Sequence, residues 1–247
     1  MGGKEGIRRL LMKGLEGLEV LFYPPYCAVC DQPVEPPLPS AFICRPCLAG
    51  LPFRMDREAV AWQGPCPLYA SFYYRPPLPK LIVSLKFSDR TDRARLLAPF
   101  LARTLLRRVP QAHAIIPVPL HKKRQRERGY NQALLLAQSL SDALDIPLLE
   151  DLLIRQVHTR RQSETQSVRE RQAQMQGAFC LKEDHELLES LRGRPVILLD
   201  DVLTTGATLA QAAKSLQGAG LEVTGLVAAS SKDAYQVYGQ AIESYYN

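Results

Sequence analysis

The chain has 247 residues, 46% of them hydrophobic, which suits one α/β domain with its own core plus a small additional unit. Its formal net charge of +6 indicates anionic partners such as phosphates or nucleic acid, without choosing between them. The apolar runs are too short to span a membrane. A secretory signal is excluded because charged residues interrupt the N-terminal apolar residues, at Arg8, Arg9, Lys13, Glu16 and Glu19. We therefore expect a cytoplasmic protein, in which paired cysteines bind metal rather than form disulfides.

An amphipathic helix is predicted at the N-terminus, in residues 1–22. Apolar residues recur there at helical spacing, at Ile7, Leu10, Leu11, Leu15, Leu18 and Phe22. We expect this helix to pack on the domain, and a partner or membrane surface is the less favoured alternative.

Residues 23–65 are predicted to form a zinc-ribbon-like unit. They contain two C-x-x-C pairs, Cys27 with Cys30 and Cys44 with Cys47, separated by a proline-rich loop. Structural zinc takes four tetrahedral ligands, and each short turn supplies two sulfurs. Four thiolates leave no position for a water, so the predicted zinc is structural, and it must organise a unit whose prolines cannot build a core. Four unpaired buried cysteines are the alternative interpretation.

Strands and helices alternate in residues 66–231. We expect strands at 68–74, 114–118, 147–149, 196–199 and 222–229, and helices at 77–86, 93–107, 130–144 and 209–216. This alternation is typical of a mostly parallel sheet flanked by helices. Residues 232–247 form a C-terminal extension to which the sequence assigns no role.

A basic loop follows the predicted strand 114–118. The segment from Pro117 to Leu120 ends the strand, and five cations follow between Lys122 and Arg128. A strand end followed by cations and a helix start can hold an anion, with Leu120 as a candidate contact. A solvated basic loop is an equal alternative.

A long polar segment, Arg155 to Gln176, has almost no core-forming residues. Such segments are either functional or disordered in a compact domain, and mobile lids close over reacting phosphates to exclude water. Lys86, at the end of the predicted helix 77–86, is a further candidate phosphate contact, although a cation also suits a helix C-terminus.

The nine residues from Asp200 to Thr208 join a buried strand to a helix. Ligands of open α/β sheets bind beyond the carboxyl ends of the strands, where a helix N-terminus supplies free N–H groups and partial positive charge. The carboxylates of Asp200 and Asp201 suit ribose hydroxyls. The loop suits a phosphate, because it combines hydroxyl groups with small residues that allow close approach, in Thr204, Thr205, Gly206, Ala207 and Thr208. A helix N-cap is the alternative, but it explains only one of these residues.

This stretch resembles the phosphoribosyl-pyrophosphate (PRPP) motif of type I phosphoribosyltransferases. The resemblance implies that Asp200 and Asp201 contact the ribose 2′ and 3′ hydroxyls and that residues 204–208 surround the 5′-phosphate. It also implies that the polar segment is a catalytic hood whose arginines, Arg160 and Arg169 among them, face a leaving pyrophosphate. The loop at Leu120 then becomes a candidate pyrophosphate contact, and Mg²⁺ is expected to accompany PRPP.

The whole set of motifs is similar to the ComF family. The similarity depends on the four cysteines, Leu85-Lys86-Phe87, Pro117-Val118-Pro119-Leu120, Arg128-Gly129-Tyr130-Asn131-Gln132, the segments at 159–162 and 169–179, and the PRPP motif. It implies a bacterial cytoplasmic protein of natural transformation that acts on incoming single-stranded DNA beside a helicase-like partner. Glutamine PRPP amidotransferases share the fold, but a glutaminase domain and an N-terminal catalytic cysteine are lacking in this chain.

Three functions stay open at this point. A phosphoribosyltransferase with an unknown acceptor would stabilise positive charge on the ribose with its two acids and the leaving pyrophosphate with cations. A nucleic-acid adaptor would use the cysteine pairs, the basic loop and the polar segment, with Tyr23, Tyr26 and Phe42 available for stacking. A regulator would sense PRPP without turnover, and fold alone does not decide among the three.

Overall fold

A computed structural model describes residues 26–34, 43–54, 58–85, 92–120, 129–155, 178–182 and 184–232. The chain divides into two compact units, Met1–Leu51 and Pro52–Asn247, which are treated separately below. The predicted N-terminal helix lies outside the described residues, as does the C-terminal extension beyond Lys232. Within the described ranges, no helix has the length and apolar character that crossing a membrane requires.

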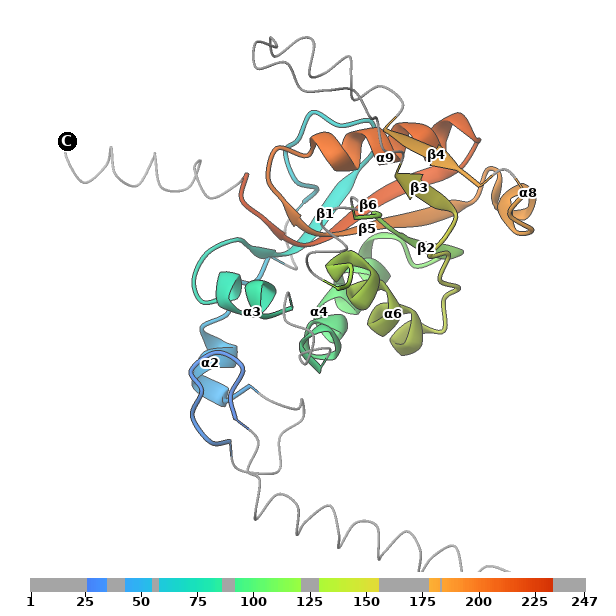
Figure 1. Ribbon diagram of the computed structural model, residues 1–247. Coiled ribbons are helices and arrows are strands. Elements are labelled where there is room, and N and C mark those ends of the chain that lie inside the picture. Colours follow the sequence, from blue (N-terminus) through green and yellow to red (C-terminus); the bar gives the residue numbers. More distant parts are fainter. Residues whose placement is uncertain are drawn as a thin grey trace, which may run out of the picture. The chain divides into compact units, whose positions relative to one another are not determined.

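The larger unit is built on a four-stranded sheet in which every pairing is parallel (Figure 1). Its strands lie in the order β1 (Leu68–Tyr73), β6 (Glu222–Ser230), β5 (Pro195–Leu203) and β2 (Ala114–Pro117). Leu148 adds an isolated parallel bridge to Ile115 at the outer edge, where a short strand was expected. The predicted parallel sheet with flanking helices is therefore confirmed.

Helices cover both faces of this sheet, which is why its central strands are apolar throughout. Helices α4 (Asp92–Arg108) and α6 (Gln132–Leu144) pack on one face and α9 (Ala207–Gly218) on the other, as Figure 1 shows. The four residues Val196–Leu199 of β5 are at most 1% exposed. Gly225 of β6 allows close packing, because a Cβ there would lie 2.6 Å from the Leu68 side chain.

Four short elements were not expected from the sequence. They are the antiparallel strands β3 (Leu153–Arg155) and β4 (Phe179–Leu181), which bracket the polar segment, and the small helices α2 (Arg45–Ala49) and α8 (Leu188–Leu191). Helix α3 (Leu78–Ser84) lies where a helix was predicted, at 77–86. Three-residue strands carry too few positions to show an alternating pattern, so pairing rather than local sequence creates them.

The outer edge of β1 is covered by the chain that precedes it. Phe53 bridges Phe72 in antiparallel fashion, and the N–H groups of Arg54 and Val60 donate to the carbonyls of Ser71 and Leu68 at 2.8 and 2.7 Å. Covering the edge removes a row of exposed backbone groups. Residues 52–65, which were predicted to belong with the cysteine pairs, lie in the larger compact unit, which begins at Pro52.

Candidate functional site

A cavity of about 320 Å³ opens at the carboxyl edge of the sheet. Its walls come from three strand ends: Tyr74 follows β1, the segment 118–120 follows β2, and Asp200 and Asp201 belong to β5. Its remaining lining residues come from the helices, loops and strands around these ends: Ile82, Asn131, Gln132, Ala133, Arg155, Val202, Thr204 and Thr208. The size falls within the range of small-ligand sites. The structure therefore brings together five of the predicted residues: Leu120, Asp200, Asp201, Thr204 and Thr208.

A smaller hollow of about 60 Å³ adjoins this cavity at the amino end of α9. Asp200, Thr204 and Thr208 line both, and the hollow adds the other predicted loop residues, Thr205, Gly206 and Ala207. The Thr205 hydroxyl accepts a hydrogen bond from the Ala207 N–H at 3.4 Å. Free N–H groups of a helix N-terminus beside hydroxyl groups suit a phosphate.

The two acids are held by the backbone that follows them. Asp200 accepts a hydrogen bond from the Asp201 N–H at 2.9 Å, and Asp201 accepts one from the Val202 N–H at 2.7 Å. The acids lie on a buried strand, as predicted, and this strand, β5, continues past them to Leu203. Pairing with β6 explains the continuation, since Asp200 lies opposite Val227 and Val202 opposite Ala229. The acids therefore stand on a paired strand.

Burial, and then the charge of Asp201, raise the pKa of Asp200 well above its ordinary value of 3.8. The Asp201 N–H and the positive charge of Arg155 act in the opposite direction but do not outweigh them. An acid that is costly to ionise in the free protein gains from a ligand that supplies hydroxyl donors or a nearby cation. Ionising the buried Asp200 lowers the stability of the free protein, so the position of the two acids suits the binding of a polar ligand.

A first prediction concerns stability and pH. The pKa of Asp200 is higher in the folded than in the unfolded protein, so the folded state binds more protons between pH 3.8 and the raised pKa. Its contribution to the free energy of unfolding is therefore full below pH 3.8 and falls as the pH rises through this window. We expect Asp200→Asn to raise the melting temperature at neutral pH and to lose that advantage in acid. Thermal melts of both proteins from pH 4 to 8 measure this, and a variant that is less stable at neutral pH would contradict it.

Gly206 has a structural role besides leaving room for a ligand. Its φ of +81° lies in the left-handed region, and a Cβ there would lie 2.9 Å from Cε3 of Trp62. Trp62, the single tryptophan of the chain, is partly buried, and its indole N–H donates to the Cys66 carbonyl at 2.9 Å. Trp62 therefore packs against residues 204–208, which we call the phosphate loop, at the backbone of Gly206. No motif in the sequence pointed to Trp62.

We expect Gly206→Ala to lower the free energy of unfolding by about 1–3 kcal/mol, because a left-handed backbone and a close contact are both imposed on the new methyl group. Chemical denaturation measures the change. Gly218→Ala is the matched control within the same helix, since Gly218 has no positive φ and open space around its Cβ position. Equal effects of the two substitutions would show that the loop tolerates a side chain at position 206.

Asn131 positions the wall that follows β2. Its side chain accepts from the Ala133 N–H at 3.1 Å as the N-cap of α6, and its amide donates to the Val118 carbonyl at 2.9 Å. These two bonds connect the segment 118–120 to the start of α6. Asn131 was quoted as part of a motif but not predicted as a site residue, and Tyr74 and Arg155 were not predicted either.

Other predicted contacts cannot be placed. Lys86, Arg160 and Arg169 lie outside the described residues, as do most of the basic loop after Leu120 and most of the polar segment. Arg155, at the last position of β3, is placed: it lines the cavity, and its guanidinium stacks on the Phe179 ring at 5.5 Å. Arg155, the first residue of the polar segment, therefore supplies one cation to the cavity.

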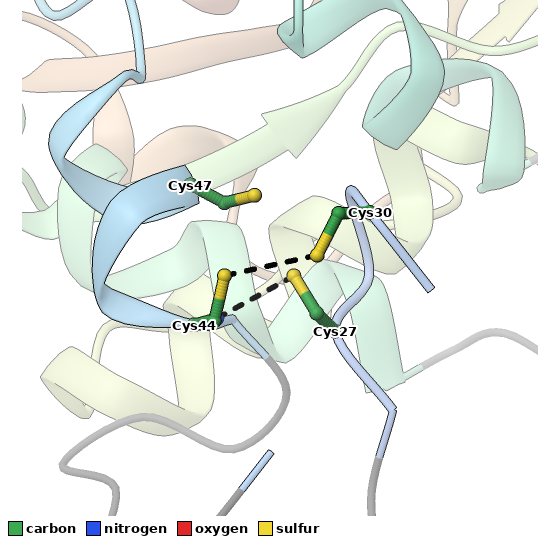
Figure 2. A group of neighbouring side chains, drawn as sticks. All are labelled: Cys27, Cys30, Cys44 and Cys47. Carbon is green, nitrogen blue, oxygen red and sulfur yellow. Dashed lines mark hydrogen bonds between the residues drawn. The ribbon is translucent and has the colours of Figure 1, made fainter. Parts of the chain in front are cut away.

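The four cysteines of the smaller unit form one cluster (Figure 2). Their sulfur atoms all lie within 4.8 Å of one another, and those of Cys30 and Cys44 are 3.8 Å apart. A tetrahedral zinc with bonds of about 2.3 Å requires sulfurs about 3.8 Å apart. Cys44 directly precedes α2 and Cys47 lies within it, so one helical turn supplies two ligands. The predicted four-cysteine arrangement is confirmed and is compatible with structural zinc.

The protonation of this cluster favours a cation. Burial opposes ionisation of Cys27, but the N–H groups of Cys44, Cys30 and Val29 outweigh it and lower the pKa of that thiol to about 6. Burial, followed by hydrogen bonds with the other cysteines, raises the pKa of Cys47. Four thiolates this close repel one another unless a positive ion lies between them. The cluster therefore fits Zn²⁺ in charge as well as in geometry.

Comparison with known proteins identifies the relatives of this chain. The family described as "Phosphoribosyl transferase domain" matches residues 131–240. "Competence protein F" of Haemophilus influenzae is 37% identical over 207 residues, which cover 80% of this chain and 81% of that protein. "DNA utilization protein YhgH" of Escherichia coli K12 is 33% identical, with 77% and 83% covered. Adenine phosphoribosyltransferase from Leishmania tarentolae is a structural neighbour with 18% identity and a TM-score of 0.37, covering 63% of this chain and 67% of that one.

The matched domain contains the two acids, the phosphate loop and Asn131. The match to Competence protein F extends over most of both chains, at an identity that indicates common descent rather than a shared motif. The chain therefore belongs to the ComF family of competence proteins, and it carries that family's phosphoribosyltransferase domain.

Proposed function

We propose that this protein binds Mg²⁺–PRPP in the cavity at the carboxyl edge of the sheet and serves the uptake or use of single-stranded DNA. One observation carries the proposal: the paired acids of β5, the loop at the amino end of α9 and the segment after β2 surround a single cavity. A phosphoribosyl ligand needs all three, because it joins a 5′-phosphate, two ribose hydroxyls and a pyrophosphate.

In the proposed complex the 5′-phosphate occupies the smaller hollow, where residues 204–208 supply hydroxyl and N–H donors. The ribose hydroxyls donate to Asp200 and Asp201, whose carboxylates are already oriented by the backbone. The pyrophosphate lies toward the segment 118–120 and Arg155. Mg²⁺ would neutralise the pyrophosphate oxygens, and it needs no dedicated cage of protein ligands.

The same arrangement suits transfer of the phosphoribosyl group. When the bond from C1 to pyrophosphate breaks, positive charge develops on the sugar, and the two carboxylates stabilise it. Arg155, which also lines the cavity, stabilises the departing pyrophosphate. The described lining includes no histidine, and the acceptor is not defined by these residues. Lys86, Arg160 and Arg169 stay predicted phosphate contacts.

The DNA-related part of the proposal is supported by relatives named "Competence protein F" and "DNA utilization protein YhgH". We propose that the four cysteines bind a structural zinc. A second candidate function is a PRPP-sensing adaptor without turnover, favoured because the chain has a separate cysteine unit in addition to the unit that contains the cavity. In that case PRPP would control binding to DNA or to another protein.

Binding and turnover are tested in one series. Trp62 packs against the phosphate loop, so its fluorescence is expected to change when PRPP with Mg²⁺ or ribose 5-phosphate is added. Release of pyrophosphate is then followed with a panel of nucleobases, with and without single-stranded DNA. Turnover with one base would establish the transferase, and binding without turnover would favour the sensor. Absence of PRPP binding by calorimetry would overturn both.

A further inference from the structure

A second basic surface follows strand β1 and helix α4. We call it the β1–α4 band and define it by two tyrosines and four exposed arginines: Tyr69, Tyr73, Arg75, Arg103, Arg107 and Arg108. Two of these guanidinium groups lie over the rings: that of Arg108 is 5.4 Å from the centre of Tyr69, and that of Arg75 is 5.2 Å from the centre of Tyr73. Arg54 also lies over Tyr73, at 5.7 Å, but it is only 6% exposed and donates to the Glu58 carbonyl at 3.0 Å, so it is not part of the band.

The alternation of β1 creates one side of the band. Leu68, Ala70 and Phe72 are at most 2% exposed, so Tyr69, Ser71 and Tyr73 point to the opposite face of the strand. The Ser71 hydroxyl lies 2.9 Å from that of Thr104, which shows that this face meets α4. Both tyrosines therefore lie along the junction of strand and helix.

Helix α4 runs antiparallel to β1 and supplies the other side. Arg108 is beside Tyr69 and Thr104 is beside Ser71, so the helix moves toward Tyr73 as its numbering decreases. Arg103 and Arg107 are exposed on this helix. Since Tyr69 and Tyr73 are about 13 Å apart along an extended strand, the cations form a row rather than a single anion site.

The row carries strong positive charge. Residues 93–108 of α4 contain five arginines and no acidic residue, and the one acid of this helix, Asp92, is its first residue, far along the helix from Arg103, Arg107 and Arg108. Cations are favourable at a helix C-terminus, which explains Arg107 and Arg108 but not Arg103 or Arg75. Arginine stays charged at all physiological pH values, and its N–H groups donate to phosphate oxygens.

A row of arginines fits a polyanion with regularly spaced phosphates. The strand that carries the tyrosines ends at Tyr73, and the next residue, Tyr74, lines the cavity, so the band leads to the edge of that site. Relatives are named for competence and DNA utilization, which favours DNA over other polyanions. We propose that the β1–α4 band binds the sugar–phosphate backbone of single-stranded DNA. This rests on the proposed role in DNA uptake, but not on the proposed binding of PRPP.

The test is a titration of fluorescent oligothymidylate with the full-length zinc-loaded protein at several salt concentrations. Each phosphate contact contributes about 0.7 to the slope of log affinity against log salt for single strands. Arg103→Gln/Arg107→Gln is expected to lower this slope by about 1.4, which corresponds to about 25-fold weaker binding at 0.1 M salt. Arg75→Gln, on a loop rather than on α4, is expected to lower it by about 0.7 without touching the helix.

The control is Arg194→Gln/Lys214→Gln, which removes two exposed cations outside the band, one of them on α9 across the sheet. We expect this control variant to keep nearly all its affinity for oligothymidylate. We expect all the variants to bind PRPP with the affinity of the parent protein. Equal losses in band and control variants would overturn the proposal, because net charge alone would then explain binding. The proposal would also be overturned if Tyr26→Ala in the smaller unit abolished binding of oligothymidylate while the band variants kept it. A third contrary result would be band variants that lose binding to anionic lipid vesicles but not to DNA.

Discussion

Replacing both acids of β5, as Asp200→Asn/Asp201→Asn, is expected to weaken PRPP binding by about 10²- to 10⁴-fold. Each carboxylate–hydroxyl bond contributes about 1.5–3 kcal/mol, and two such bonds correspond to this factor. The amides keep the shape of the side chains, and each retains an oxygen for the N–H that now orients the acid. The change therefore removes charge from the ribose position without a cavity. Isothermal calorimetry with PRPP and Mg²⁺ measures it.

The matched control is Asp142→Asn/Asp145→Asn, which neutralises two exposed acids at the end of α6. Asparagine also tolerates the left-handed backbone that Asp145 adopts there, so this variant should fold normally. We expect its PRPP affinity to match that of the parent. If the β5 variant bound PRPP with undiminished affinity, the ribose would have to lie elsewhere and the proposed function would fail.

Removing zinc, by chelation or by Cys44→Ser, is expected to unfold the smaller unit while the larger one stays folded. Zinc contributes about 10–16 kcal/mol to the folding of comparable small units. Among the described residues of this unit, the buried apolar side chains other than cysteine are few: Ala28, Val29, Val34, Ile43 and Leu51. The larger unit, Pro52–Asn247, is a separate compact unit with its own sheet and hydrophobic core. Limited proteolysis should then release the N-terminal segment, while the Trp62 fluorescence response to PRPP persists.

Cys180→Ser serves as the control for this experiment, because Cys180 lies on β4 and outside the four-cysteine cluster. It should retain one zinc per chain by metal analysis and resist proteolysis like the parent. A Cys44→Ser protein that kept its zinc, or a parent protein that contained none after expression in zinc-supplemented medium, would show that the cluster is not a metal site.

The sequence by itself determined the parallel sheet, the phosphate loop and the cysteine cluster. Each depends on neighbouring residues: the apolar run 196–199 can only be buried, Asp200–Thr208 carries its ligand groups in one short stretch, and each C-x-x-C pair places two sulfurs on one turn. Local patterns of this kind need no knowledge of the rest of the fold. Family resemblance added the roles of these residues, and the comparisons confirmed the family.

Only the tertiary structure decided which distant residues complete the site. Tyr74, Asn131 and Arg155 come from separate elements, and they reach one cavity because parallel strands end at the same edge of the sheet. Trp62 under the phosphate loop and the stacked arginines of the β1–α4 band depend likewise on packing between segments far apart in the chain. The continuation of β5 past its acids came from pairing with β6. Such contacts are set by the geometry of packed strands and helices, which no short stretch of sequence encodes.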